Sequence, residues 1–126
     1  MISLTVIGDP VPKGRPRFGQ GRTYTPPATV DAERAIMLAW QALRPRPQPW
    51  PADVPLALTV LAVLRKPKRT KREQPTAKPD WDNLGKLVSD ALAGFAYADD
   101  KQIVRATVEK VYGTPARWEI TLEEAY

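Results

Sequence analysis

Acidic side chains and one lysine gather where a turn meets an apolar, helix-like segment. Residues 78–86 read KPDWDNLGK and contribute Asp80, Asp82 and Lys86, and the acidic pair Asp99 and Asp100 follows the helix-like segment. The chain has no histidine and no cysteine, which excludes disulfides, thiolate catalysis and the usual zinc sites. Carboxylate oxygens without nitrogen or sulfur favour Mg²⁺ or Mn²⁺. The pattern therefore predicts a site for a hard divalent cation.

Clustered carboxylates are costly unless a cation or a proton neutralises them. At an effective dielectric constant near 20, two like charges 4 Å apart repel by about 4 kcal/mol. A bound divalent cation removes this repulsion, and it can generate hydroxide from water and neutralise charge on a phosphate. Lys86 follows Asp82 by one helical turn, where it would orient the attacking water or stabilise the pentacovalent phosphorus.

A purely structural interpretation of the same residues stays open. Asp82 would then cap a helix N-terminus, and Asp80 would belong to the turn after Pro79. Lys86 would be a surface lysine paired with Asp82 or Asp90. Two observations weigh against this alternative. Asp80 and Asp82 are two residues apart, so an extended approach places them on one side, and Lys86 lies beside both.

Four segments are expected to be β-strands. Residues 2–7, 104–112 and 118–122 alternate between apolar and polar side chains. The run 56–64 is almost wholly apolar, which predicts a central strand covered on both faces or a strand buried by a dimer partner. The Gly-Thr-Pro turn at 113–115 favours a hairpin between the last two strands.

Two segments are expected to be α-helices. The first begins at 25–27, where a threonine hydroxyl precedes two prolines, and ends at a later run of prolines. The second repeats apolar residues at i, i+3, i+4, i+7 and i+8, begins at Asp80 or Asp82 and ends at Gly94. The expected fold is α+β: a single two-layer domain over all 126 residues, with a mixed sheet and the order β-α-β-α-β-β.

The rest of the chain is basic, with a formal net charge of +5 and a pI near 9.7, which favours a nucleic acid partner. Two loops, at 9–24 and 65–79, carry most of this charge, and the first is too rich in proline and glycine for regular structure. Phe18, Tyr24 and Trp81 are candidates for stacking on unpaired bases, although we expect Trp81 to pack instead. Either loop alone reads as merely solvated, but two beside an acidic site favour DNA. The expected phosphate contacts are Lys13, Arg15, Arg17, Arg22, Lys68, Arg69, Lys71 and Arg72.

The N-terminal segment lacks the charged start and long apolar core of a signal peptide, and no apolar run is long enough to span a bilayer. By elimination we expect a cytoplasmic protein, with no membrane partner and no small-molecule cofactor.

Three motifs carry a resemblance to a known family. They are D-x-D-N-x-x-K at 80–86, D-A-L at 90–92 and D-D-x-Q-I-V at 99–104. Together they resemble the signature of the RusA family, small Holliday junction resolvases of bacteria and their phages. The opening GDPVPKGRPR at 8–17, with Tyr-Thr-Pro at 24–26, is similar to the start of many phage-type members. The matches span most of the chain, and the first and third motifs are specific in combination.

The resemblance implies a RusA-like homodimer that binds four-way DNA junctions and makes paired symmetric nicks with Mg²⁺ or Mn²⁺, in recombination and repair. It implies metal ligation by Asp80, Asp82 and Asp100, because the second acid of the 99–100 pair is the catalytic one in the family. It also implies that Lys86 is the essential basic partner.

Two further expectations concern the dimer and the helix. A C2 dimer matches the approximate two-fold symmetry of a four-way junction, and an exposed apolar surplus of 56–64 is a candidate interface.

Gly85 departs from the expected pattern, because glycine destabilises a helix by about 1 kcal/mol relative to alanine. It predicts a locally loose helix just before Lys86.

The alternative function is a non-catalytic protein that binds junctions or single-stranded DNA. Such a protein gains nothing from Asp80, Asp82 and Asp100, which repel phosphate when no metal is bound. A small basic structural domain would explain the apolar periodicity but leaves the clustered acids without a role.

Overall fold

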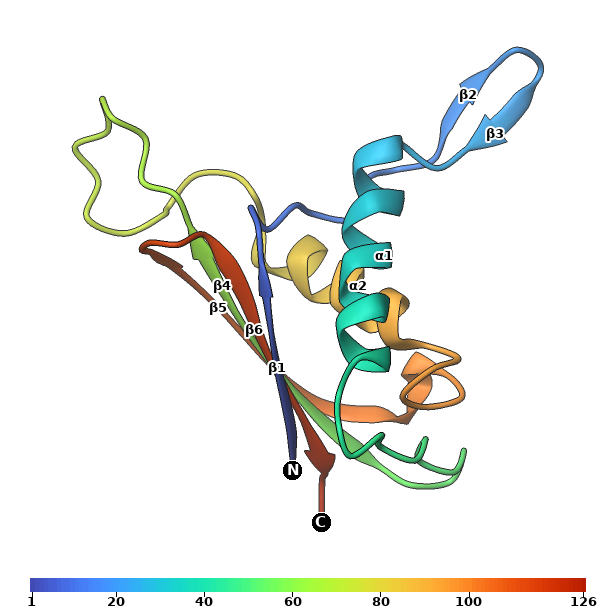
Figure 1. Ribbon diagram of the computed structural model, residues 1–126. Helices are drawn as coiled ribbons and strands as arrows, with labels where there is room; N and C mark the ends of the chain where they lie inside the picture. The colour runs from blue at the N-terminus through green and yellow to red at the C-terminus, as the bar shows by residue number, and fades with distance from the viewer.

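A four-stranded mixed sheet forms one layer of the fold, and two helices cover one of its faces (Figure 1). The computed structural model describes residues 1–126. The sheet has the order β1-β6-β4-β5, from strands β1 (Ile2–Ile7), β4 (Leu56–Leu64), β5 (Ile103–Tyr112) and β6 (Arg117–Glu124). The helices are α1 (Pro27–Gln41) and α2 (Trp81–Leu92). The predicted α+β fold with a mixed sheet and two main helices is confirmed.

The core lies between the helices and the sheet because each element presents one apolar face. In β6, Trp118, Ile120 and Leu122 are buried, and they alternate with side chains that reach the open face of the sheet. Removing a side chain of this size from water stabilises the fold by about 1.5–3 kcal/mol. The buried side chains of α2 are Leu84, Leu87, Val88, Ser89, Ala91 and Leu92.

Strand β4 is an inner strand of the sheet, as its apolar run predicts, but the helices cover only one of its faces and not both as expected. It pairs in parallel with β5 and antiparallel with β6. Even on the face turned away from the helices, Ala57 and Val63 are buried, and Thr59 is the only exposed side chain of the strand. Leu61 is the one apolar side chain of the strand that is partly exposed, so the expected exposed apolar surplus of 56–64 is wrong.

The predicted hairpin between the last two strands is also wrong. Strands β5 and β6 do follow one another through the turn at 113–115, but β4 lies between them in the sheet. The chain leaves β5 at Tyr112, passes the end of β4 and enters β6 on its other side (Figure 1). A local turn signal cannot reveal this arrangement, because it carries no information on a strand from elsewhere in the sequence that lies between the two.

The loop at 9–24 contains a short hairpin where irregular structure was expected. Strands β2 (Arg17–Gly19) and β3 (Arg22–Tyr24) pair antiparallel. The two residues that join them, Gln20 and Gly21, have φ angles of 52° and 77°. Positive φ at both central positions is what a type I′ hairpin turn requires. The Gln-Gly pair was the available signal, and the density of proline and glycine around it obscured it.

The N-cap residues of both helices make no side-chain cap, although Oδ1 of Asp82 accepts a 2.9 Å hydrogen bond from the N–H of Asn83 in the first turn of α2. The N-cap position of α1 is Pro26 and not Thr25, and that of α2 is Asp80; neither makes a side-chain capping hydrogen bond. The carboxylate of Asp80 is therefore not used to start its helix, which removes the simplest structural explanation for it.

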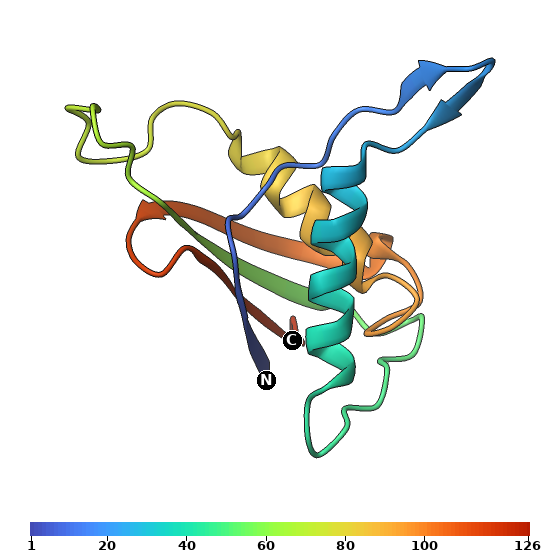
Figure 2. The same cartoon turned by 45° about the horizontal axis from the view of Figure 1, so that its top comes forward.

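Two basic segments project from the same end of the molecule. The β2–β3 hairpin extends to one side and the loop between β4 and α2 extends to the other, with the start of α2 between them (Figures 1 and 2). No helix of the chain combines the length and the apolar character needed to cross a membrane.

Candidate active site

The start of α2 is held against the sheet by two contacts. On β5, Nζ of Lys110 donates hydrogen bonds to the backbone oxygens of Ala77 (3.0 Å) and Pro79 (2.8 Å), just before the helix begins. At Gly85, a Cβ atom would lie 3.0 Å from Cγ2 of Val108. Gly85 therefore permits a close approach of α2 to β5. The expected local looseness of the helix is wrong, since the helix is continuous from 81 to 92 and tightly packed there.

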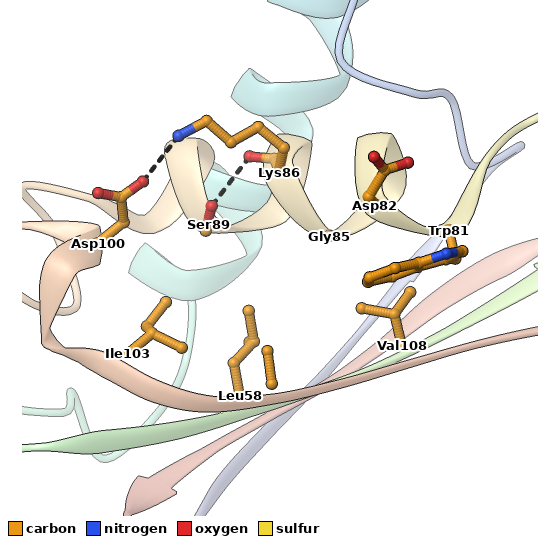
Figure 3. A pocket seen from close by; sticks show the side chains of 10 residues that line it. Leu58, Trp81, Asp82, Gly85, Lys86, Ser89, Asp100, Ile103 and Val108 are labelled. Carbon is orange, nitrogen blue, oxygen red and sulfur yellow. Dashed lines mark hydrogen bonds and ion pairs between the residues drawn. The ribbon is translucent and has the colours of Figure 1, made fainter.

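Lys86 and Asp100 meet across the front of this helix (Figure 3). Nζ of Lys86 donates a 2.9 Å hydrogen bond to Oδ2 of Asp100. This bond raises the pKa of Lys86 above its usual value and lowers the pKa of Asp100. Both groups are therefore ionised at neutral pH. The sequence predicted both residues for the site, and the structure brings them together from positions 14 residues apart.

The two adjacent acids at 99–100 have different structural roles. Oδ1 of Asp99 accepts a 2.9 Å hydrogen bond from the backbone N–H of Lys101 and caps a short 3₁₀-helix, η1 (Asp100–Gln102). Asp99 is thus occupied by its own turn, whereas Asp100 lies one residue further on and faces Lys86. This gives a physical reason for the choice of Asp100 over Asp99, which the family resemblance alone had suggested.

Gln102 fixes the turn that presents Asp100. Its buried side chain accepts hydrogen bonds from the backbone N–H groups of Ala98 (2.9 Å) and Asp99 (3.1 Å). Its amide nitrogen donates to the backbone oxygens of Pro51 (2.8 Å) and Val54 (3.2 Å). One side chain therefore ties η1 to the segment that precedes β4. It belongs to a motif found in the sequence, but its role was not predicted.

Asp82 and Asp80 line different pockets. Asp82 lines a pocket of about 260 Å³ together with Lys86 and Asp100, whereas Asp80 lines a neighbouring pocket beside Lys13 and Asn83. The expectation that Asp80 and Asp82 share one side is therefore wrong, because the helix begins between them. Lys86 also pairs with neither of them: its partners are Asp100 and, at 3.3 Å, Asp90.

The acidic side chains at the pocket are of the ligand type that a magnesium-type cation takes, but they do not form a closed site. No three acidic side chains of the chain gather closely enough to enclose a metal ion. Mg²⁺ in proteins keeps several water ligands and is commonly held by only one or two carboxylates together with substrate phosphate. Asp82 and Asp100 line one pocket from its two ends, with Lys86 and Ser89 between them (Figure 3), and each carboxylate is a ligand of the type that this ion takes. Ligation by Asp80, Asp82 and Asp100 stays a prediction.

The floor of this pocket is apolar. Leu58, Ile103, Ala106 and Val108 line it from the sheet, and the ring of Trp81 lies over Val108 at one end (Figure 3). Trp81 rests on Val108 but is 62 % exposed, so the expectation that it packs is met on one side of the ring only. An exposed indole beside acidic groups is a surface on which an unpaired base can stack.

Comparison with known proteins supports the resemblance seen in the sequence. The family model described as "Endodeoxyribonuclease RusA" matches residues 8–123. The chain belongs to the RusA family. One relative of this RusA-family protein is the "Uncharacterized protein YqaN" of Bacillus subtilis (strain 168), with 32 % identity over 136 residues, 98 % of this chain and 96 % of that protein. The relative's name states no activity, so the functional information comes from the family description.

The basic residues of this RusA-family chain fall into two groups. Lys13 is paired with Glu33 (3.1 Å) and Asp90 (3.2 Å) and is only 28 % exposed. Burial by itself lowers the pKa of Lys13. The hydrogen bonds and charges of Glu33 and Asp90 together outweigh this effect, so the pKa of Lys13 lies above its usual value. The other predicted phosphate contacts are exposed and form no ion pair: Arg15, Arg17, Arg22, Lys68, Arg69, Lys71 and Arg72.

Three residues near the site were missed or undervalued in the sequence. The sequence indicates Asp90 only as a surface partner of Lys86 and as part of a motif, Gln102 only as part of a motif, and Lys110 not at all. The helical spacing of Lys86 and Asp90 was the one available signal. Gln102 and Lys110 act on backbone oxygens of distant segments, and a side-chain-to-backbone contact leaves no pattern in a sequence.

Proposed function

We propose that this protein is a Mg²⁺- or Mn²⁺-dependent endodeoxyribonuclease that resolves four-way DNA junctions by paired symmetric nicks, as a homodimer acting in recombination and repair. Membership of a family of endodeoxyribonucleases supports the hydrolysis of DNA. The observation that supports the proposal for the site is that Asp82, Lys86 and Asp100 line one pocket. These three come from the start of α2, its middle and a separate turn.

Each residue has a separate part in the proposed reaction. Asp82 and Asp100 would hold the cation, with Asp80 approaching from the neighbouring pocket. The cation, when bound, supplies an activated water and neutralises charge on the scissile phosphate. Lys86 carries a fixed positive charge at the edge of the same pocket and would stabilise the negative charge that develops on the phosphate oxygens. The two exposed basic segments, the β2–β3 hairpin and the loop between β4 and α2, form two basic arms that would bind the DNA backbone on either side.

The test is cleavage of a synthetic four-way junction with each arm labelled in turn, in Mg²⁺, in Mn²⁺ and in EDTA. We expect paired nicks at symmetric positions with either metal and none in EDTA. Asp82→Asn should abolish cleavage while junction binding in EDTA persists. A matched control is Asp31→Asn, an exposed acid on α1 without an ion pair, which should cut as the wild type does.

Tight junction binding without cleavage in either metal would instead support the non-catalytic binding protein. Sedimentation of the free protein and of its junction complex gives the number of chains independently of activity. A monomer on the junction would contradict the dimer part of the proposal without touching the nuclease part.

A further inference from the structure

Asp90 lies at the centre of a chain of four ion pairs. Its Oδ1 is 3.3 Å from Nζ of Lys86, and its Oδ2 is 3.2 Å from Nζ of Lys13. Beyond these, Lys86 reaches Asp100 at 2.9 Å and Lys13 reaches Glu33 at 3.1 Å. Charges alternate in sign along the whole chain, so each group is flanked by opposite charge. One carboxylate thus connects the lysine of the candidate site with a lysine from the N-terminal segment.

The Lys13 end of this chain is anchored by the backbone. The N–H of Lys13 donates to the backbone oxygen of Asn83 on α2 (2.9 Å), and the N–H of Gly14 donates to Oγ1 of buried Thr29 on α1 (3.0 Å). A Cβ at position 14 would lie 2.7 Å from that hydroxyl oxygen, so the segment is seated closely on both helices. Lys13 is therefore held at the base of the β2–β3 hairpin and does not extend into solvent.

Exposure differs along the chain of ion pairs. The side chains of Lys13, Glu33 and Asp90 are 28 %, 22 % and 23 % exposed, whereas that of Lys86 is 54 % exposed. A less exposed charge interacts in a lower dielectric and is screened less by salt. Asp90 is thus a partly buried counter-charge, paired with Lys13, for the more exposed Lys86.

This arrangement has a consequence for Lys86 if Asp100 binds a cation. A carboxylate that ligates a cation is a weaker partner for a lysine, because the two positive charges repel. Asp90 is the second contact of Lys86 and is not in the pocket that contains Asp82 and Asp100. It would retain the ammonium group at the pocket edge when the contact with Asp100 weakens.

We infer that Asp90 is a positioning residue for Lys86, and that Lys13 holds Asp90 in place for this task and does not serve as a phosphate contact. The inference rests on the proposed function, since it concerns the position of the Lys86 ammonium group in that reaction. It also corrects the expectation that Lys13 contacts DNA, by giving its charge an internal partner on each side.

The first experiment measures the steady-state cleavage of a four-way junction by Asp90→Asn and Asp90→Glu. Misplacement of a catalytic group by about an ångström can cost a hundredfold in rate, so Asp90→Asn should lower kcat roughly tenfold to a hundredfold while KM and junction affinity in EDTA stay unchanged. Asp90→Glu keeps the charge and should recover part of kcat. Asp31→Asn on α1 is the matched control and should match the wild type, and thermal unfolding confirms that each variant folds.

The second experiment is a double-mutant cycle with Lys13→Met. If Lys13 acts through Asp90, Lys13→Met lowers kcat in the wild type but has little further effect in Asp90→Asn. The same cycle on the unfolding free energy of the metal-free protein should show a non-zero coupling between the two residues. Junction affinity and its salt dependence should not change with Lys13→Met.

Three results would overturn the inference. The first is a wild-type kcat in Asp90→Asn, and the second is an additive effect of Lys13→Met in both backgrounds. The third is a loss of junction affinity on Lys13→Met with a shallower salt dependence, which would make Lys13 a phosphate contact. A wild-type protein that cuts no junction in either metal would remove the proposed function as well, and so differs from all three.

Discussion

At the scale of residues, the adjacent acids Asp99 and Asp100 show how one backbone turn separates two roles. Asp99 caps η1 through Lys101, and Gln102 completes the reciprocal capping box with the backbone N–H of Asp99. Asp100 is left to face Lys86. The sequence shows only two identical side chains in a row, so their difference lies in the local hydrogen bonds.

Alanine at each of the two acids should separate these roles. Asp100→Ala should abolish junction cleavage with little change in stability, because its carboxylate faces the pocket. Asp99→Ala should cost about 1 kcal/mol of unfolding free energy through the lost cap. It should reduce cleavage only partly, through looser presentation of Asp100. Urea unfolding and single-turnover cleavage measure the two effects, and equal losses of cleavage would contradict the assignment.

Gln102 should behave as a structural residue with an effect on the site. Gln102→Ala leaves two backbone donors and two backbone acceptors without their partner, and an unsatisfied buried group costs about 1–3 kcal/mol. We expect lower stability in urea unfolding together with slower cleavage. Gln102→Glu places a carboxylate oxygen against the backbone oxygens of Pro51 and Val54 in a buried site, so it should be at least as destabilising as alanine.

At the scale of elements, the contact between α2 and β5 determines where the site lies. Gly85 lets the helix approach Val108, and Lys110 ties the preceding loop to the same strand. The apolar periodicity of α2 was sufficient to predict the helix and its buried face. How closely α2 approaches β5 depends on the absence of a side chain at Gly85. In the sequence alone, this glycine predicted a loose helix.

Replacement of Gly85 by alanine tests this contact. Alanine favours a helix by about 1 kcal/mol over glycine, but its Cβ would lie 3.0 Å from the branched side chain of Val108. We expect no net gain in unfolding free energy in the wild type. In a Val108→Ala background the clash is gone, so the same substitution should gain about 1 kcal/mol. Equal effects in the two backgrounds would show that the approach of helix and strand is not tight.

Strand pairing was the part of the fold that the sequence predicted least well. The alternation in 104–112 and 118–122 identified two strands correctly, yet not that β4 separates them. Alternation reports which face of a strand is buried, and it carries no information on which neighbour the strand bonds to. The Gln20-Gly21 turn was the opposite case, because a usable local signal was outweighed by the surrounding composition.

At the scale of the whole molecule, two basic arms flank one end of α2 and leave the site between them (Figure 2). Composition predicted that the charges lie in two loops. The distribution of tasks among the charges required the structure, since Lys13 is bound by two carboxylates while Arg15 and Arg17 on the hairpin arm are exposed and unpaired.

Salt dependence distinguishes the arms from the rest of the surface. Each side chain that contacts a phosphate contributes roughly −0.9 to the slope of log K against log salt concentration. Arg15→Ala with Arg17→Ala should therefore flatten the slope by about twice that value for junction binding in EDTA. Arg44→Ala with Arg46→Ala removes the same charge from the proline-rich segment after α1 and should leave the slope unchanged. Equal slopes for both pairs would contradict a role of the hairpin arm in DNA binding.

The position of β6 within the sheet has a consequence for biosynthesis. This strand comes last in the order of elements, yet it pairs with β1 on one side, from Ile2 opposite Leu122, and with β4 on the other. Until it has emerged from the ribosome, β1 and β4 lack a common neighbour and the core has no Trp118, Ile120 or Leu122. Long-range pairing of this kind also slows folding, because a long loop must close before its contacts form. A chain that lacks β6 therefore cannot form the complete sheet beneath α2, so the candidate site depends on a strand that contributes no residue to it.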